Sequence, residues 1–297
     1  MTAKLYVFPF NAMGSPCELK IYCLNKAQGE KVANKVMEDV HRIEARYSRY
    51  KTESVLSLIN REAEQGGEID VDDETLALLN YANTCYQQSK GLFDISSGVL
   101  RKAWNFKEQK IPKQEEIDKI LRSVGWEKIK INGQSIKFLT AGMQLDFGGI
   151  GKEYAVDRAA AICQQYGIEH GLVNLGGDVK VIGPHVDGSP WQLSVAHPRK
   201  PGKILTKLEV FSGAIASSGD YERCIVINGK RYSHVLNPKT GWPVSEFASV
   251  TVVADQCVIA GSACTITMLM EKAGKKWLKK LGLRYIWVDQ EGRVREG

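Results

Sequence analysis

Residues 145–159 (LDFGGIGKEYAVDRA) constrain the fold of this chain more than any other stretch. Leu145 and Phe147 flank Asp146 as they would at the end of a strand, and the residues after the glycines recur at helical spacing. The pattern predicts a strand that turns into a helix through a glycine-rich loop. Glycine lets the backbone approach a ligand closely, and the start of a helix favours an anion. Lys152, one turn further on, adds a full positive charge.

This loop does not identify a ligand by itself. It has neither the GxGxxG spacing of a dinucleotide-binding turn nor the GxxxxGK[ST] pattern of a phosphate-binding loop, so neither mechanism can be transferred to it. A tight connection between a strand and a helix would require the same glycines. The functional interpretation therefore depends on other parts of the chain.

The composition indicates a globular protein and excludes a disordered one. The 297 residues are 43% hydrophobic and 25% charged, with a formal net charge of +6. Much of the lysine surplus lies at 272–280, on an expected helix whose other face carries Trp277 and Leu278. Because no aromatic residues alternate with these lysines, they indicate a solvated face, and we expect no nucleic-acid partner.

The cysteines and the N-terminal residues bear on the compartment. Seven cysteines include no CxxC pair and most lie in apolar runs, which predicts buried thiols rather than a disulfide framework or a zinc site. The apolar run before Pro9 is too short for a signal peptide or a membrane span. We expect a cytoplasmic protein, although a periplasmic lipoprotein given without its leader would look the same.

Hydrophobic periodicity predicts helices first and strands later. Helices are expected at 27–46, in a short run ending at Asn60, at 75–88, at 114–122, after the glycine loop and at 256–270. Short strands are expected within 17–24, 126–147, 172–253 and 284–288, with hairpin turns at Asn132-Gly133 and Asn228-Gly229. We therefore predict an α+β fold in which residues 1–297 form a single domain, with a mixed or antiparallel sheet core and flanking helices.

Several segments, in this order along the chain, resemble one known family. They are FNAMGS (10–15), YSRYKTESVLSLIN (47–60), GLFDISSG (91–98), LDFGGIGKEYAVDRA (145–159), LVNLGGDVKVIG (172–183), AIASSGDYER (214–223), YSHVLNPKTGWPV (232–244) and SVTVVADQCVIAGSACT (249–265). Together they resemble the ApbE family, the FAD:protein FMN transferases, over nearly the whole chain.

The resemblance implies an enzyme that binds FAD, cleaves its diphosphate with Mg²⁺, and attaches FMN through a phosphoester to a threonine of an acceptor flavoprotein, releasing AMP. It implies that a backbone carbonyl of Gly149 and the side chain of Thr265 ligate the metal. It makes His234 the catalytic candidate. The positions expected to contact FAD are Met13, Tyr50, Leu92, Phe93, Asp94, Asp146, Lys152, His234 and Val235.

Two of these positions also suit a purely structural role. Asp94 is placed to cap a new helical turn, which alone would account for an acid there. Tyr50 has the ring needed to stack on the flavin or the adenine, but it also suits aromatic packing at a corner between two helices.

The chain departs from the family in its last motif. Family members usually carry Ala-Asp-Ala-x-x-Thr, in which the aspartate is an Mg²⁺ ligand, whereas AGSACT (260–265) places Gly261 at that position. A hard cation prefers anionic oxygen, so three outcomes follow. The metal binds more loosely with help from water, FAD phosphates or Ser262; the fold brings in another acid; or the protein binds FAD without transferring FMN. A related alternative is an Mg²⁺-dependent pyrophosphatase that releases FMN and AMP.

Overall fold

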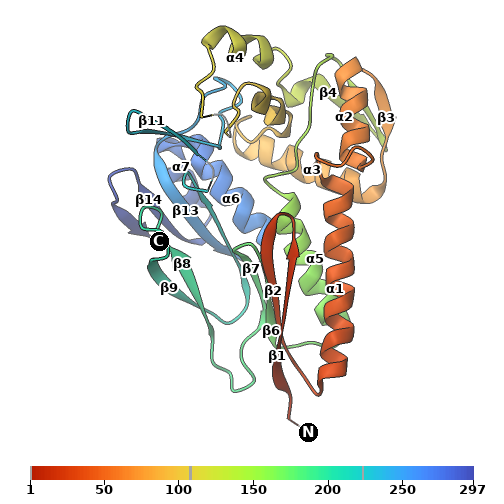
Figure 1. The fold of residues 1–297 in the computed structure, drawn as a ribbon, viewed down its shortest axis with the longest axis vertical. Helices are drawn as coiled ribbons and strands as arrows, with labels where there is room; N and C mark the ends of the chain where they lie inside the picture. The colour runs from red at the N-terminus through yellow and green to blue at the C-terminus, as the bar shows by residue number, and fades with distance from the viewer. Residues whose placement is uncertain (1, 107–108, 223) are drawn as a thin grey trace.

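The computed structural model describes residues 2–106, 109–222 and 224–297. It has the expected α+β architecture, built on an eight-stranded sheet with helices packed beside it (Figure 1). Each pair of neighbouring strands in this sheet is antiparallel. In spatial order the strands are β1 (Lys4–Ala12), β2 (Ser15–Cys23), β6 (Gly171–Leu175), β7 (Asp178–Gly183), β10 (Gly213–Gly219), β13 (Phe247–Ala254), β14 (Arg284–Asp289) and β15 (Val294–Glu296).

Three helices, α1 (Lys26–Tyr47), α5 (Gly151–Gln165) and α6 (Cys257–Met270), pack together against this sheet. The predicted apolar face of α1 is confirmed, because its residues at spacings of three and four are all buried, namely Val32, Val36, Val40, Ile43 and Tyr47. A separate apolar cluster includes residues of the main sheet and of a hairpin, β8 (Trp191–Ala196) and β9 (Ile204–Val210), where Trp191 and Leu208 pack with Val181.

A second, mainly helical part lies at the top of Figure 1. It contains α2 (Val55–Gln65), α3 (Asp73–Gln88), the 3-10 helices η1 (Ile95–Lys102) and η2 (Trp126–Lys128), α4 (Gln114–Leu121), and a small sheet of β3 (Glu68–Asp70), β5 (Ser135–Phe138) and β4 (Ile129–Asn132). Leu79 and Phe138 from this part belong to the same buried cluster as Val250 of β13. The helical and strand-rich parts therefore share one core, as expected.

Both predicted hairpin turns are present. Asn132-Gly133 joins β4 to β5, and Asn228-Gly229 joins β11 (Cys224–Ile227) to β12 (Lys230–Ser233). Asn228 and Gly229 both have positive φ, at 51° and 75°, which a type I′ turn requires. The chain folds here as the dipeptides predict.

Two sequence predictions about element ends are wrong. Leu145–Phe147 is not a strand: its backbone is held by the side chain of Asn60 and by the carbonyl of Ile95 instead of by a neighbouring strand. Helix α2 does not end at Asn60, because Ala63 continues its buried face, and it stops at Gly66, whose φ of +72° suits a left-handed cap. Both errors arise where tertiary contacts decide the local structure.

The cysteine prediction is confirmed for the described residues. All seven cysteines are free thiols, and six of them are buried, with Cys224 intermediate. Within the same residues, no helix combines the length and apolarity needed to cross a membrane. Four lysines of α7 (Lys272–Lys280) are exposed, which agrees with a solvated face, whereas Lys275 is half-buried and pairs with Glu246.

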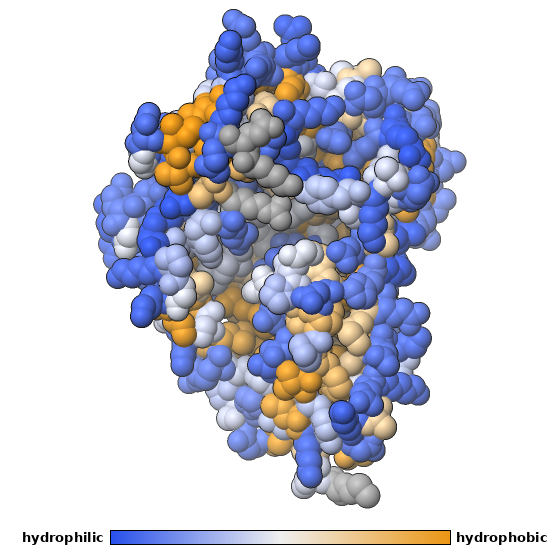
Figure 2. All heavy atoms as spheres, viewed as in Figure 1, coloured by the Kyte–Doolittle hydropathy of each residue, from blue (hydrophilic) through white to orange (hydrophobic). Residues whose placement is uncertain are grey.

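The two edge strands of the main sheet, β1 and β15, are more exposed than its central strands. β1 carries Pro9 opposite Glu18 of β2, and its Leu5 and Val7 are exposed. Figure 2 shows apolar surface near the lower end of the molecule, where Figure 1 places this strand. β15, at the other edge, is a strand of three exposed residues.

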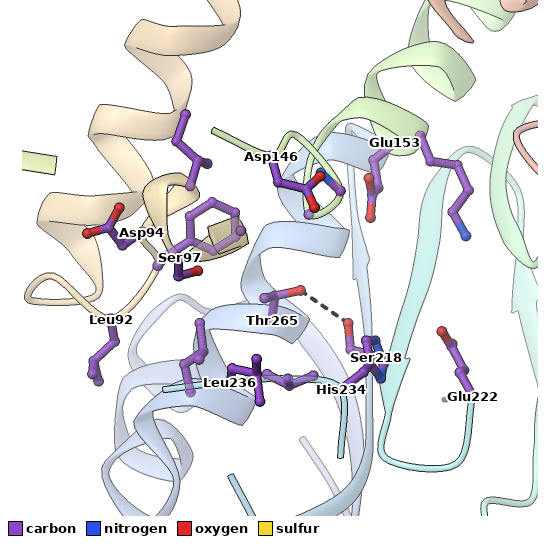
Figure 3. Close-up of a pocket in the computed structure, with 18 of the residues that line it drawn as sticks. Leu92, Asp94, Ser97, Asp146, Glu153, Ser218, Glu222, His234, Leu236 and Thr265 are labelled. Carbon is purple, nitrogen blue, oxygen red and sulfur yellow. Dashed lines mark hydrogen bonds between the residues drawn. The ribbon is translucent and has the colours of Figure 1, made fainter. Parts of the chain in front are cut away.

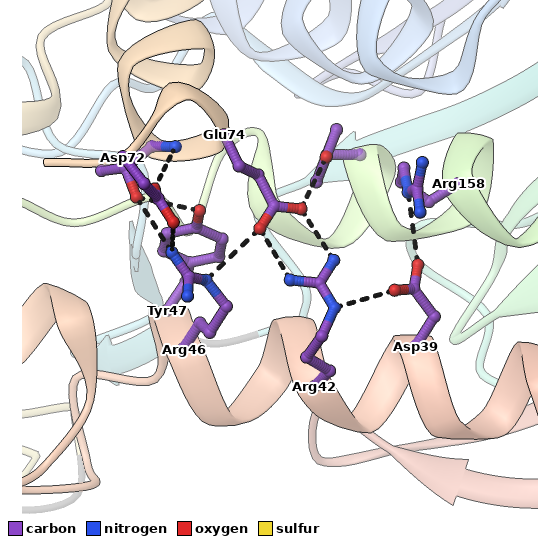
Figure 4. A network of polar contacts seen from close by, with 9 residues as sticks. Asp39, Arg42, Arg46, Tyr47, Asp72, Glu74 and Arg158 are labelled. Carbon is purple, nitrogen blue, oxygen red and sulfur yellow. Dashed lines mark hydrogen bonds and ion pairs between the residues drawn. The ribbon is translucent and has the colours of Figure 1, made fainter.

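A network of charged side chains ties α1, α3 and α5 together (Figure 4). Arg42 of α1 donates two hydrogen bonds of 2.7 Å to the carboxylate of Glu74 in α3. Tyr154 of α5 donates to the same carboxylate at 2.8 Å. Asp39 accepts from Arg42 at 2.8 Å and pairs with Arg158 of α5 at 3.3 Å. We call the contacts of Glu74 with Arg42 and Tyr154 the clamp. Its bidentate geometry makes it stronger than a single surface ion pair.

We expect Glu74→Gln to lower the free energy of unfolding by about 1–2 kcal/mol near neutral pH, because charged hydrogen bonds are lost from a partly exposed site. The hydrogen bonds from Arg42 help to hold the pKa of Glu74 below its ordinary value. A depressed pKa stabilises the folded state above the unfolded-state pKa, and this contribution disappears as pH falls through the folded-state value. Urea denaturation should therefore show a difference between variant and wild type that shrinks in acid.

Glu30→Gln is the matched control. Glu30 pairs with Lys26 at 3.3 Å on the exposed face of α1, where an ion pair contributes less than about 0.5 kcal/mol. Equal destabilisation by the two substitutions would show that the clamp contributes nothing beyond an ordinary surface pair.

Candidate functional site

A cavity of about 180 Å³ lies where the helical part meets one end of the main sheet. Figure 3 shows its walls. They include the loop before η1, η1 itself, the turn before α5 and its first helical turn, the first residue of β7, the end of β10, the segment 234–236 after β12 and one face of α6. Because β7 and β10 are antiparallel, the start of one and the end of the other lie at the same end of the sheet.

The structure brings most of the predicted site residues to this one cavity. Met13 and Tyr50 are not among its lining residues. Those that line it are Leu92, Phe93, Asp94, Asp146, Gly149, Lys152, His234, Val235 and Thr265. Segments separated by more than a hundred residues in the sequence therefore meet in space.

The turn before α5 is fixed from outside by a side-chain amide. Asn60 of α2 donates to the carbonyl of Leu145 at 3.0 Å and accepts from the N–H of Leu145 at 2.7 Å. The N–H of Asp146 donates to the carbonyl of Ile95 at 2.9 Å. The amide of Asn60 thus replaces the strand partner that the sequence pattern implied, and it attaches the turn to the helical part.

Two glycines around this turn are required by close packing. A Cβ on Gly98 of η1 would lie 2.6 Å from the Cβ of Asp146, so a side chain there would force the turn away from η1. A Cβ on Gly149 would lie 3.1 Å from the Cζ of Phe93. Gly98 and Gly149 therefore allow the segments of the cavity wall to pack closely, a role that is independent of ligand binding.

Asp146 lies between two arginines. Arg49 and Arg101 each approach its Oδ2 with a nitrogen at 3.5 Å, and its Oδ1 accepts from the N–H of Gly148 at 2.8 Å. The guanidinium of Arg49 lies 4.8 Å from the ring centroid of Tyr50. Tyr50 is 76% exposed, and Arg49 also donates to its hydroxyl at 2.7 Å, so its ring lies on the surface against Arg49.

Met13 lies at the turn between β1 and β2, outside the cavity lining. Its backbone has a positive φ of 52°, and its N–H donates to Glu44 Oε1 at 2.8 Å. Its side chain packs against the main core.

Asp94 performs the capping role that its sequence position predicted. Its Oδ1 accepts from the N–H of Ser96 at 2.8 Å and from the Ser96 hydroxyl at 2.7 Å, and its Oδ2 accepts from the N–H of Trp126 at 3.0 Å. Burial raises its pKa despite these donors. Figure 3 shows its carboxylate directed away from Thr265, so the capping role accounts for both oxygens.

Charged groups are concentrated at the start of α5. Lys152 Nζ pairs with Asp178 Oδ2 at 2.8 Å, and the Asp178 side chain is only 5% exposed. Burial would lower the pKa of Lys152, but the attraction of Asp178 outweighs it and the pKa is raised. Burial, reinforced by repulsion from Asp178, raises the pKa of the neighbouring Glu153 to about 8. The start of α5 therefore carries an ion pair with a second acid, Glu153, next to it.

Thr265 occupies the face of α6 that borders the cavity. Its Oγ1 lies 3.2 Å from the Oγ of Ser218 at the end of β10 (Figure 3). Ser262, by contrast, is bonded to the hydroxyl of Tyr81 in α3 at 2.7 Å and to the carbonyl of Ile259 at 3.2 Å. Ser262 therefore has its hydroxyl occupied elsewhere and does not substitute for the acid missing at Gly261.

His234 and Val235 both line the cavity and follow β12, which ends at Ser233. The chain leaves the strand here because Val235 is bonded to other groups: its N–H donates to Ser233 Oγ at 3.1 Å and its carbonyl accepts from the N–H of Val244 at 3.0 Å. This irregular segment places His234 in the cavity wall.

Some polar lining residues were not singled out from the sequence, among them Arg101, Glu153, Asp178 and Ser218. The last three lie inside segments that carried the family resemblance, but the resemblance assigned no function to these residues. Arg101 had no such signal, since a basic residue near the end of a short helix is usually solvated. Within the described residues, no group of three or more His, Cys, Asp or Glu side chains could hold a metal ion.

Comparison with known proteins agrees with this geometry. The model of the ApbE family matches residues 13–287. The FAD:protein FMN transferase of Haemophilus influenzae is 27% identical over 250 residues, covering 80% of this chain and 72% of the relative. That of Escherichia coli is 26% identical over 301 residues, covering 97% and 85%.

Solved structures are similar over the whole fold. A crystal structure of the ApbE protein from Thermotoga maritima has a TM-score of 0.91 and 29% identity, covering 99% of this chain and 97% of that one. The flavin transferase ApbE from Vibrio cholerae has a TM-score of 0.88 and 25% identity, with the same coverage.

We expect Asn60→Ala to lower the free energy of unfolding by about 1–3 kcal/mol, because two hydrogen bonds to a buried backbone are lost together. Hydrogen exchange at the Leu145 amide should accelerate as well. Asn80→Ala, on the exposed side of α3, is the control and should change stability by less than about 0.5 kcal/mol. Similar behaviour of the two variants in urea denaturation would mean that Asn60 does not hold the turn.

Proposed function

Because the chain belongs to the ApbE family, we propose that it is an FAD:protein FMN transferase that modifies a threonine of an acceptor flavoprotein. The observation that carries this proposal is the convergence of nearly all the predicted site residues on one cavity beside the start of α5. Met13 and Tyr50 remain proposed contacts on the surface next to it.

The proposed reaction breaks the phosphoanhydride bond of FAD and forms a phosphoester bond to the acceptor. The threonine oxygen forms a bond to the phosphorus on the FMN side of FAD, and the bond from that phosphorus to the bridging oxygen breaks. AMP leaves with the electron pair, and the threonine proton passes to a base. His234 is our candidate for that base, because it lines the cavity and an imidazole ring nitrogen can accept a proton.

The cavity is suited to the diphosphate rather than to all of FAD. At about 180 Å³ it is smaller than the roughly 300–1,000 Å³ typical of sites that enclose a drug-sized ligand. We therefore infer that the diphosphate lies at the start of α5 near Lys152, where the helix dipole and the ammonium group favour an anion. The flavin or the adenine then extends over the surface beside it, with Tyr50 available for stacking.

The residues present fit a divalent cation such as Mg²⁺. Gly149 and Thr265 line the cavity, and a buried oxygen of Glu153 makes no hydrogen bond, which leaves it available as a ligand. A hard cation takes oxygen donors of these kinds. A bound Mg²⁺ would neutralise charge on the diphosphate during transfer.

We propose a cytoplasmic location for this activity. All seven cysteines are free thiols, as is usual for proteins of a reducing compartment.

The proposal is tested by incubating the purified protein with FAD, Mg²⁺ and a threonine-containing acceptor domain from a covalently flavinylated protein. The acceptor should gain the mass of one FMN less water, with AMP released in equal amount. The same acceptor with its threonine replaced by alanine is the control. Bound FAD without any acceptor adduct would favour a flavin-binding protein, and AMP release without acceptor would favour a pyrophosphatase.

Thr265→Val should raise the Mg²⁺ concentration needed for half-maximal transfer by about tenfold or more, because it removes the hydroxyl and keeps the shape of the side chain. FAD binding without metal should stay near the wild-type value. Ser218→Ala, which removes only the hydroxyl that faces Thr265, is the comparison variant and should have a smaller effect. An unchanged Mg²⁺ requirement in Thr265→Val would exclude Thr265 as a ligand.

A further inference from the structure

The side chain of Glu153 on α5 fills the space beside Gly261 on α6. Gly261, Thr265 and Leu269 recur at spacings of four residues on α6, and Thr265 and Leu269 both line the cavity. A Cβ built on Gly261 would lie 2.5 Å from the Cγ of Glu153 and 2.7 Å from its Oε1. The side chain of Glu153, which reaches across from α5, therefore occupies the space into which a residue at 261 would project.

The carboxylate of Glu153 lacks the partners that a buried acid normally has. The residue is only 8% exposed, and its Oε2 is buried with no hydrogen-bond partner. The nearby ammonium of Lys152 is paired with Asp178 instead. Buried carboxylate oxygens in folded proteins are nearly always hydrogen-bonded, paired or bound to a cation. The orphaned oxygen thus indicates a missing partner in the cavity.

The groups around this carboxylate include oxygen donors of the kind a hard cation takes. Thr265, which carries a hydroxyl, lines the same cavity as Glu153 (Figure 3). Gly149, whose backbone carbonyl is a possible ligand, lines it too. Ser262 is excluded as the substitute for an acid at 261 because its hydroxyl is bonded to Tyr81.

The four other acids of the cavity wall, Asp94, Asp146, Asp178 and Glu222, all have partners. Asp178 is neutralised by Lys152 at 2.8 Å. Both oxygens of Asp94 accept hydrogen bonds at the start of η1 and η2. Asp146 Oδ2 also makes no hydrogen bond, but a nitrogen of Arg49 and a nitrogen of Arg101 each lie 3.5 Å from it. Compared with these four, Glu153 has a buried oxygen that makes no hydrogen bond, and no arginine or lysine forms an ion pair with it in the described residues, so this oxygen is left for a cation.

We propose that Glu153 supplies the anionic ligand of a divalent cation in this chain, reaching from α5 through the space left by Gly261 to join Thr265 and Gly149. This rests on the proposed function for the identity of the cation, since Mg²⁺ is the ion that flavin transfer would need. In this chain α5 would supply the carboxylate that other family members carry on α6. The metal site would therefore have its acid although residue 261 is glycine. Gly261 is required by this arrangement, because any side chain there would displace Glu153.

The test measures metal binding directly, with Mn²⁺ as the probe because it takes the same oxygen ligands as Mg²⁺. Free Mn²⁺ is followed by electron paramagnetic resonance in titrations of the protein alone and of the protein with FAD. Glu153→Gln keeps the shape of the side chain and removes its charge. We expect it to weaken Mn²⁺ binding tenfold or more while FAD binding without metal changes less than about twofold.

Glu18→Gln is the control for the loss of one negative charge, because Glu18 forms only a surface pair with Lys20 at 2.8 Å. It should bind Mn²⁺ like the wild type. If Glu153→Gln also binds Mn²⁺ like the wild type, or if the wild type binds no Mn²⁺ with or without FAD, the proposal is overturned.

A reciprocal exchange keeps the test decisive if Glu153→Gln folds poorly. Gly261→Asp alone should weaken Mn²⁺ binding, because two side chains compete for one space. Glu153→Gly combined with Gly261→Asp should recover Mn²⁺ affinity to within about threefold of the wild type, because the carboxylate returns from α6. A double variant that binds no better than Glu153→Gly alone would contradict the exchange.

Failure of this inference is distinguishable from failure of the proposed function. Mn²⁺ binding that depends on Glu153, without acceptor modification, would leave the ligand assignment intact and reject the transfer. Acceptor modification by a protein in which Glu153→Gln binds Mn²⁺ normally would do the reverse.

Discussion

The hydrogen bonds between the Asn60 amide and the backbone of Leu145 are the constraint on which the candidate site depends. They hold a glycine-rich turn that has no strand partner, and they fix it to the helical part of the molecule. Gly98 then allows η1 to pack against Asp146, which brings the loop with Phe93 to the start of α5. The Asn60 amide and the close contact between Gly98 and Asp146 thus bring two parts of the chain together in one cavity wall. The main sheet supplies the opposite wall.

Much of the fold could be predicted from local patterns because those patterns have local causes. The buried stripe of α1 and the Asn228-Gly229 hairpin follow from helical periodicity and from the backbone freedom of the turn residues. The segment 145–147 could not be predicted in this way. Its apolar residues are buried like those of a strand, but a side chain from α2 satisfies its backbone, and no local pattern shows that pairing.

The sequence predicted which segments line the candidate site. It did not predict which side chains within the site contact one another. The family resemblance selected the lining segments, including His234 and Thr265, because motifs are preserved as short sequences. It did not reveal that Lys152 is paired with Asp178, or that Ser262 is turned toward Tyr81. The relation between Gly261 and Glu153 joins residues more than a hundred positions apart, and only the packing of α5 against α6 brings them together.

The two outer strands of the main sheet have a consequence for the protein in concentrated solution. A long, regular edge strand can recruit a neighbouring molecule and seed fibrous aggregates. Here Pro9 interrupts the row of backbone donors on β1, and β15 offers three residues, two of them the charged Arg295 and Glu296. The sheet therefore ends at both sides in strands that are poor templates for polymerisation, even though Leu5 and Val7 leave apolar surface on one of them.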